Sequence, residues 1–228
     1  MKATVLTHAG IEGPGLLEDI LKERGVKYET VDATTQKIPE TDVIIAMGGP
    51  MSANDSYRWL ISELQGIREH VDGGGYFFGT CLGSQLLAKA IGGSVRKAKI
   101  REIGSCEVKL TEGGVKDELF AGFGNRLKVF QWHGETFNSL PIGAAVIATG
   151  NAMTQAFRYK NAYGLQFHLE ATERMVMAWV EAYHNEVEEV PTTTDKVIQG
   201  FIENSDYYHG AVNRIFGRFL DTACRKKE

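Results

Sequence analysis

The sequence predicts an α/β protein built on a doubly wound, mostly parallel sheet. Short runs rich in Val, Ile and Phe occur at residues 3–8, 43–47 and 76–78, and each is followed by glycine and then by a helical pattern. This alternation is typical of βαβ units. The 26 glycines supply many strand-to-helix turns. With 43% hydrophobic residues, the 228-residue chain can bury a sizeable core without disulfides or a structural metal.

Two amphipathic segments connect these strands. Leu16, Leu17, Ile20 and Leu21 have helical spacing, and the apolar residues between positions 59 and 71 repeat it. We interpret both apolar faces as parts of the core.

The pattern changes to strands after Gly93. Apolar strand-like runs surround Cys106, Phe130 and Ile147, and two further runs flank a turn at Lys160 and Asn161. The last two runs predict a β hairpin added to the sheet.

The remainder of the chain is helical in pattern from Thr172, with an interruption at Pro191. Residues 190–228 are interpreted as a C-terminal helical extension, although three glycines argue against one straight helix. Because no linker or repeat is visible, we expect one domain over residues 1–228, of the flavodoxin-like doubly wound type.

Composition excludes several classes of function. The formal net charge of -4 gives no basic field for nucleic acid. No apolar run approaches the ~18 residues of a membrane span, and the N-terminus lacks a signal-peptide core, so a cytoplasmic protein without membrane contact is expected. Three cysteines at irregular spacing, without a CxxC pair, argue against a disulfide framework or a zinc site. No metal or organic cofactor is expected, and the oligomeric state is not predicted.

Gly79-Thr80-Cys81-Leu82-Gly83 has the G-x-S-x-G spacing of a nucleophile elbow, with cysteine in place of serine. The flanking glycines permit a sharp strand-to-helix turn, which exposes the central side chain at a helix N-terminus. The helix dipole is expected to lower the pKa of the Cys81 thiol there. The alternative is a buried structural thiol, which is the common fate of an isolated cysteine.

A cysteine nucleophile needs a base and a group that orients the base. His168 ends an apolar run and Glu170 follows two residues later, so on extended backbone both side chains lie on one face. Glu170 could also be an ordinary carboxylate at the start of the next helix, favoured by the helix dipole, and the two roles can coexist.

The segment Met47–Ser52 follows an apolar strand and contains two adjacent glycines. Acyl transfer requires backbone N–H groups directed at the developing oxyanion. The Gly49 amide is a candidate donor, and the amide of Leu82, the residue after the nucleophile, is its expected partner.

These segments together resemble the class I glutamine amidotransferases, the triad enzymes that release ammonia from the glutamine side chain. The resemblance is carried by GGPMS from Gly48, GTCLGSQ from Gly79, WHGE from Trp132 and QFHLE from Gln166. It is strongest to standalone proteins similar to the amidotransferase domain of GMP synthase.

The resemblance implies a catalytic triad of Cys81, His168 and Glu170, with Cys81 forming a γ-glutamyl thioester. It places the oxyanion hole at Gly49 and Leu82. Leu169 departs from the proline common in the family, and Met51 stands where some relatives have glycine. The further residues expected to contact substrate are Gln85, His133, Gly134, Glu135 and Met51, with the backbone of the WHGE segment holding the amino-acid head group.

Three functions remain open from the sequence. The chain could be an amidotransferase subunit that passes ammonia to a separate synthase polypeptide. It could be a freestanding hydrolase of γ-glutamyl peptides that uses the same triad. It could also be a non-catalytic binding or regulatory module, although the intact Cys81, His168 and Glu170 set argues against this.

Overall fold

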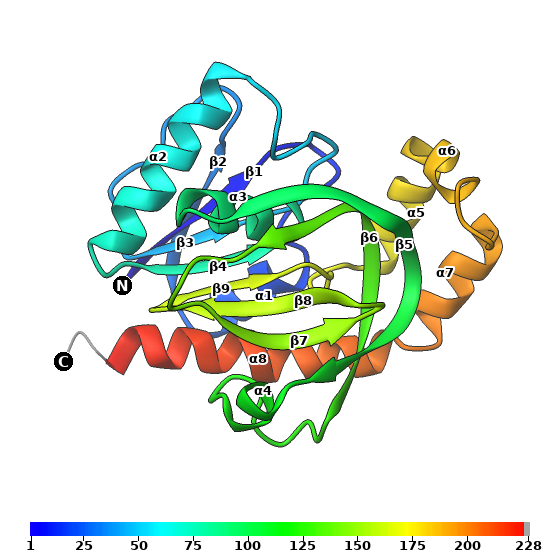
Figure 1. Ribbon diagram of the computed structural model, residues 1–228. Coiled ribbons are helices and arrows are strands. Elements are labelled where there is room, and N and C mark those ends of the chain that lie inside the picture. The colour runs from blue at the N-terminus through cyan, green and yellow to red at the C-terminus, as the bar shows by residue number, and fades with distance from the viewer. Residues whose placement is uncertain (226–228) are drawn as a thin grey trace.

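The computed structural model describes residues 1–225, and a nine-stranded sheet forms the centre of the molecule (Figure 1). The strands are ordered β2-β1-β3-β4-β9-β8-β7-β5-β6 across the sheet. Their bounds are β1 (Lys2–Thr7), β2 (Lys27–Asp32), β3 (Val43–Ala46), β4 (Tyr76–Thr80), β5 (Ser94–Leu110), β6 (Arg126–Ser139), β7 (Ala145–Gly150), β8 (Met153–Tyr159) and β9 (Ala162–Leu165).

The five strands β2-β1-β3-β4-β9 are parallel. Their helices pack on both faces, because α1 (Leu16–Glu23) joins one apolar cluster whereas α2 (Arg58–Asp72) and α3 (Leu82–Ala90) join the other. Residues 43–46 are buried throughout, as expected for a strand covered on both sides. The predicted doubly wound α/β fold is therefore confirmed.

The other half of the sheet is antiparallel. β8 and β9 form the hairpin predicted around Lys160, which adopts a φ of 53° at the turn. β7, β5 and β6 extend the sheet beyond this hairpin, and β5 is 17 residues long. These strands were predicted from the sequence, but their pairing was not. The antiparallel part of the sheet is therefore larger than the single added hairpin that we expected.

The C-terminal segment packs against the sheet through α5 (Glu173–Ala182), α6 (His184–Val187), α7 (Thr194–Ile202) and α8 (Ser205–Arg225). Short α4 (Glu112–Lys116) lies between β5 and β6. The hydroxyls of Thr172 and Thr193 cap α5 and α7 by accepting backbone N–H groups.

α8 runs along the sheet (Figure 1), and its Phe216 and Phe219 rings pack on Phe78 of β4. The predicted C-terminal extension thus contains two helices, and residues 226–228 of it lie outside the described residues. Within residues 1–225, no helix combines the length and the apolar character needed to span a bilayer.

Candidate active site

A single residue, Cys81, makes the turn between β4 and α3. Its φ of 46° and ψ of -110° lie outside the usual regions for a residue with a side chain. The glycines on either side explain how this turn packs. A Cβ on Gly79 would lie 2.7 Å from the Gly83 carbonyl, and one on Gly83 would lie 2.1 Å from the Ala46 carbonyl oxygen. Glycine is therefore required at both positions by packing, and the turn that it permits places the Cys81 thiol above the sheet.

Gly83→Ala is expected to destabilise the protein by about 3 kcal/mol, at the upper end of overpacking costs, because the clash is with backbone that cannot rotate away. The measurement is urea unfolding of the variant beside Gly10→Ala, since an added Cβ at Gly10 meets nothing within 4 Å. Equal unfolding free energies for the two variants would contradict this account of the turn.

His168 lies directly beyond the carboxyl end of β9 and is held by a backbone hydrogen bond from its N–H to the Phe130 carbonyl, 2.8 Å long. Its Nδ1 lies 2.7 Å from Glu170 Oε1. The Thr80 hydroxyl also donates to Glu170 Oε1, at 3.3 Å. Because Nδ1 is occupied, Nε2 is the ring nitrogen left to exchange a proton, and it is buried without a hydrogen-bond partner among the described residues.

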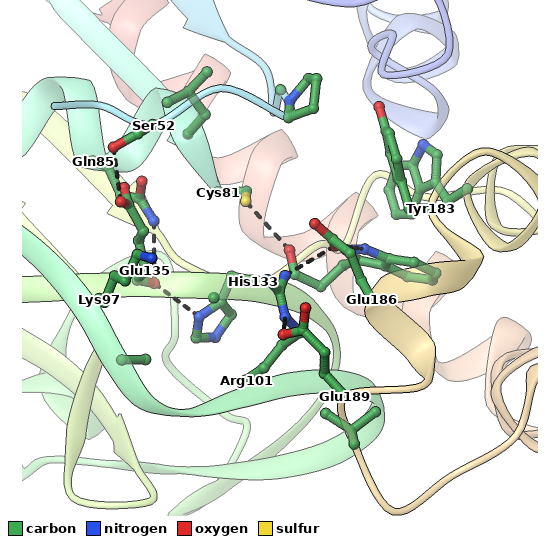
Figure 2. A pocket seen from close by; sticks show the side chains of 18 of the residues that line it. Ser52, Cys81, Gln85, Lys97, Arg101, His133, Glu135, Tyr183, Glu186 and Glu189 are labelled. Carbon is green, nitrogen blue, oxygen red and sulfur yellow. Dashed lines mark hydrogen bonds and ion pairs between the residues drawn. The ribbon is translucent and has the colours of Figure 1, made fainter. Parts of the chain in front are cut away.

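The Cys81 thiol is also buried, and it donates a hydrogen bond to the carbonyl oxygen of Trp132, 3.5 Å away (Figure 2). Burial raises the pKa of the Cys81 thiol, and the nearby His168 opposes this rise. The expectation that the helix N-terminus would lower the pKa of Cys81 is thus wrong in its net direction, because desolvation of the thiolate outweighs the favourable charges.

His168 shows the opposite balance. Burial lowers its pKa, but the Glu170 carboxylate and the Cys81 sulfur together raise the pKa well above its ordinary value. The imidazolium is therefore stabilised at this position, which favours transfer of a proton from sulfur to nitrogen.

The two amides expected to form an oxyanion hole lie beside Cys81. Leu82 begins α3, and Gly49 lies in the loop after β3. Within residues 1–225, neither the Leu82 N–H nor the Gly49 N–H donates a hydrogen bond to a protein acceptor. Leu82 is the first residue of α3, where N–H groups have no partner within the helix, and it lines the cavity, so its amide is available to a ligand.

A cavity of about 610 Å³ opens above Cys81 (Figure 2). All the residues expected to contact substrate contribute to its wall, together with Gly49, Leu82 and His168. The expected contact residues are Met51, Gln85, His133, Gly134 and Glu135.

Several of these residues are already fixed by the protein. The Gln85 side-chain amide donates to the Glu135 carbonyl at 3.2 Å, and Glu135 Oε1 accepts from the Ser52 hydroxyl at 2.7 Å. The His133 ring is engaged on both sides, by the Glu135 carbonyl at 2.9 Å and by Glu102 at 3.0 Å. The His133 ring is therefore positioned by groups of the protein on both sides.

Glu12, an acidic residue of the cavity wall that was not predicted from the sequence, is buried in the loop after β1. Its Oε1 accepts a hydrogen bond from the Tyr183 hydroxyl, 3.1 Å away. Burial raises the pKa of Glu12, and the charge of His168 opposes this rise. The position of Glu12 after β1 could have indicated this residue, because loops at the carboxyl ends of parallel strands line the crevice of this fold.

A basic residue of the same wall, Arg101, was also missed. It pairs with Glu186 at 3.0 Å and with Glu189 at 2.9 Å, and Glu186 additionally accepts from the Trp132 indole at 2.8 Å (Figure 2). These contacts tie β5 and β6 to α6 and the turn after it. No local motif could reveal them, because the partners are more than 50 residues apart.

Glu12→Gln is expected to stabilise the protein increasingly as pH rises. The unfolded carboxyl ionises near its ordinary pKa of 4.5, whereas the folded one keeps its proton to higher pH. The stability due to Glu12 is thus complete below pH 4.5 and is lost as pH rises through the raised pKa. Urea unfolding between about pH 5 and pH 8 measures this. A difference from wild type that does not change with pH would contradict it.

The other two cysteines lie apart from the cavity. Burial raises the pKa of Cys106 to about 12, and Cys224 is exposed on α8. Neither lies in the cavity wall with Cys81.

Comparison with known proteins places the chain among amidotransferases. Residues 15–178 match the family model of glutamine amidotransferase class-I. The glutamine amidotransferase-like protein YfeJ of Salmonella typhimurium is 28% identical over 97% of this chain and 96% of its own length. One subunit of the glutamine-hydrolyzing GMP synthase of Archaeoglobus fulgidus is 28% identical over 76% of this chain and 90% of its own.

A solved structure agrees with these matches. The crystal structure of a glutamine amidotransferase from Thermotoga maritima is 32% identical, with a TM-score of 0.87, and the match covers 96% of this chain and 98% of that one. The likeness therefore includes the C-terminal helices as well as the sheet.

Proposed function

This chain belongs to the class I glutamine amidotransferase family, and we propose that it hydrolyses the side-chain amide of glutamine through a γ-glutamyl thioester on Cys81. The observation that carries the proposal is the meeting of two segments, which together contain three functional side chains, at one cavity. Cys81 comes from the β4–α3 turn, and His168 lies beyond β9 with its Nδ1 2.7 Å from Glu170. A thiol, an imidazole and an orienting carboxylate in this order are the requirements of nucleophilic acyl transfer.

The proposed reaction begins with transfer of the Cys81 proton to Nε2 of His168 as sulfur attacks the amide carbon. The carbonyl oxygen becomes an oxyanion, which accepts hydrogen bonds from the Gly49 and Leu82 amides. His168 then gives its proton to the amide nitrogen, the C–N bond breaks and ammonia leaves. Water, deprotonated by His168, attacks the thioester carbon, and the proton returns to sulfur as glutamate forms.

Glu170 and the cavity wall have supporting roles in this proposal. Glu170 holds the His168 ring with Nε2 free and stabilises its imidazolium. The backbone of residues 133–135 holds the α-amino and α-carboxylate groups, while Gln85 fixes that segment through the Glu135 carbonyl. Met51 borders the oxyanion site, because its sulfur would lie 2.7 Å from a Cβ on Gly49.

The released ammonia is proposed to pass to a synthase on a separate polypeptide. The similarity to a relative that is named as one subunit of GMP synthase supports such a role. The nature of the acceptor is left to experiment, since no residue of the cavity identifies it.

Hydrolysis of γ-glutamyl peptides is the second candidate, and one observation favours it. The cavity of about 610 Å³ lies within the range that holds drug-sized ligands, so it can admit a leaving group larger than ammonia. The triad chemistry is unchanged, except that His168 protonates a leaving amine.

The test compares product formation from glutamine and from γ-glutamyl dipeptides by the purified chain, with ammonia and free amino acid measured separately. The proposal predicts ammonia and glutamate from glutamine at a higher kcat/KM than any dipeptide gives. Preferential cleavage of dipeptides would replace it with the second candidate. Absence of both reactions, together with no labelling of Cys81 by a glutamine-like chloroketone, would overturn the enzyme assignment.

A further inference from the structure

His8 lies at the carboxyl end of β1 with both ring nitrogens engaged. Nδ1 lies 3.1 Å from the carbonyl oxygen of Gly48, and Nε2 lies 3.0 Å from Oε1 and 3.2 Å from Oε2 of Glu63 on α2. The side chains of His8 and Glu63 are almost completely buried. Neither residue lies in the wall of the cavity that contains Cys81, so the pair has no direct access to a ligand there.

The Gly48 carbonyl fixes the protonation of one ring nitrogen of His8. A carbonyl oxygen can only accept a hydrogen bond, so Nδ1 of His8 must donate to it. Nε2 faces the Glu63 carboxylate, which favours a proton on this nitrogen as well. Burial lowers the pKa of His8, but the Glu63 carboxylate and the Gly48 carbonyl raise it above its ordinary value.

This contact determines the orientation of one peptide plane. No cis peptide occurs in residues 1–225, so the Gly49 N–H points opposite to the Gly48 C=O. The carbonyl is held by His8, and the N–H is thereby directed away from His8. Gly49 is in the cavity wall and His8 is not, so an N–H that points away from His8 is compatible with one that faces the cavity.

Packing prevents this peptide from moving freely. A Cβ on Gly49 would lie 2.9 Å from Cβ of His8 and 2.7 Å from Leu82. On the other side, the Glu12 carboxylate lies against Gly48, where an added Cβ would meet its Oε2. The loop is thus enclosed between His8 and Glu12.

We propose that the buried His8–Glu63 pair is a positioning device that holds the Gly48–Gly49 peptide in the orientation of a formed oxyanion hole, so that the free chain is active without a partner. This inference rests on the proposed function, because it assigns the Gly49 amide to the oxyanion. His8 and Glu63 do not touch the substrate, and they act through the Gly48 carbonyl.

Two substitutions at His8 separate its two hydrogen bonds. The amide nitrogen of Asn is as many bonds from Cα as Nδ1, so His8→Asn can keep the bond to Gly48. The amide nitrogen of Gln matches Nε2, so His8→Gln keeps only the Glu63 side. The loss of one oxyanion donor typically lowers kcat about 10²-fold to 10³-fold. We expect His8→Gln to lower kcat about 100-fold with little change in KM, and His8→Asn to remain within about tenfold of wild type.

Glu63→Gln supplies a second readout if a His8 variant does not fold. Without the carboxylate, His8 loses its second proton near or below its ordinary pKa, and the neutral ring can leave Nδ1 unprotonated against the Gly48 oxygen. The charged groups that then face His8 are Glu12 and Asp32, both of which interact with it electrostatically. We expect kcat of Glu63→Gln to fall as pH rises above about 6.5, where wild type retains its activity.

The experiment measures kcat and KM for the isolated chain and these variants on glutamine or the γ-glutamyl dipeptide that wild type prefers. Peptide-resolved alkylation of Cys81 by iodoacetamide is the control, because direct displacement at carbon needs no oxyanion hole. Equal alkylation rates with reduced kcat in His8→Gln and Glu63→Gln support the inference.

Three outcomes would overturn the inference, and they are distinguishable from one another. If wild type is active and His8→Gln matches it, the pair does not position the loop. If wild type is labelled at Cys81 by the chloroketone but turns over neither substrate, the glutamine site is supported and the preformed oxyanion hole is rejected. If wild type is neither labelled nor active, the proposed function itself fails and the inference fails with it.

Discussion

Cys81→Ala is expected to abolish glutamine hydrolysis, with kcat falling about 10⁶-fold, the loss measured when the nucleophile of a serine protease triad is removed. The reason is that Cys81 is the only cysteine among the described residues that line the cavity. Cys106 and Cys224 are outside that wall, and burial raises the pKa of Cys106 to about 12. Ammonia release from glutamine, measured at enzyme concentrations high enough to detect slow turnover, checks this.

Cys106→Ala is the matched control, since it removes a thiol of the same chain without altering the cavity. It is expected to keep the kcat of wild type. Turnover by Cys81→Ala within about 100-fold of wild type would show that the reaction does not pass through this thiol.

Glu170→Gln is expected to lower kcat about 10⁴-fold with little change in KM, as a carboxylate-to-amide change does in a serine protease triad. Glutamine has nearly the same shape, so packing is retained. The amide cannot stabilise the His168 imidazolium, and its N–H₂ group can present a donor to Nδ1 and impose the wrong tautomer. Steady-state kinetics on glutamine measures this effect.

Glu12→Gln is the control for Glu170→Gln, because it changes a carboxyl group near His168 that does not bond to the imidazole ring. Glu12 also interacts electrostatically with His168, but its carboxylate accepts its hydrogen bond from Tyr183, whereas Glu170 bonds to the ring at 2.7 Å. We expect Glu12→Gln to stay within about tenfold of the wild-type kcat. Equal losses in both variants would indicate that Glu170 acts through general electrostatics and not by orienting the ring.

The fold could be predicted largely because its parallel half is encoded locally. The runs that became β1, β3 and β4 are rich in apolar residues and have a glycine within or shortly after them, and their helices show clear periodicity. The pairing of β5 with both β6 and β7 could not be predicted in the same way. Register between distant antiparallel strands depends on tertiary contacts that no short window contains.

The residues of the site likewise fall into those that short segments predict and those that depend on tertiary contacts. Cys81 and the two glycines around it form one turn, and His168 and Glu170 are two residues apart, so their geometry follows from short segments. Glu12, Arg101 and the His8–Glu63 pair depend on contacts between elements. Their partners lie between 55 and 171 residues away in sequence, so only the folded structure brings them together.

The direction of the Cys81 pKa shows a further limit of local reasoning. The position at a helix N-terminus is visible in the sequence, and it favours the thiolate. The extent of burial is not visible there, and in the folded protein it raises the pKa of the thiol. A large desolvation effect can therefore reverse a prediction made from the turn alone.

The proposed covalent γ-glutamyl intermediate on Cys81 can be detected by intact-mass analysis after rapid mixing with glutamine and acid quenching. We expect a fraction of wild-type protein to be heavier by one γ-glutamyl group, with the added mass on the peptide that contains Cys81 and absent from Cys81→Ala. Ammonia release by wild type without any such adduct on the turnover timescale, or with the adduct on another residue, would contradict this proposal.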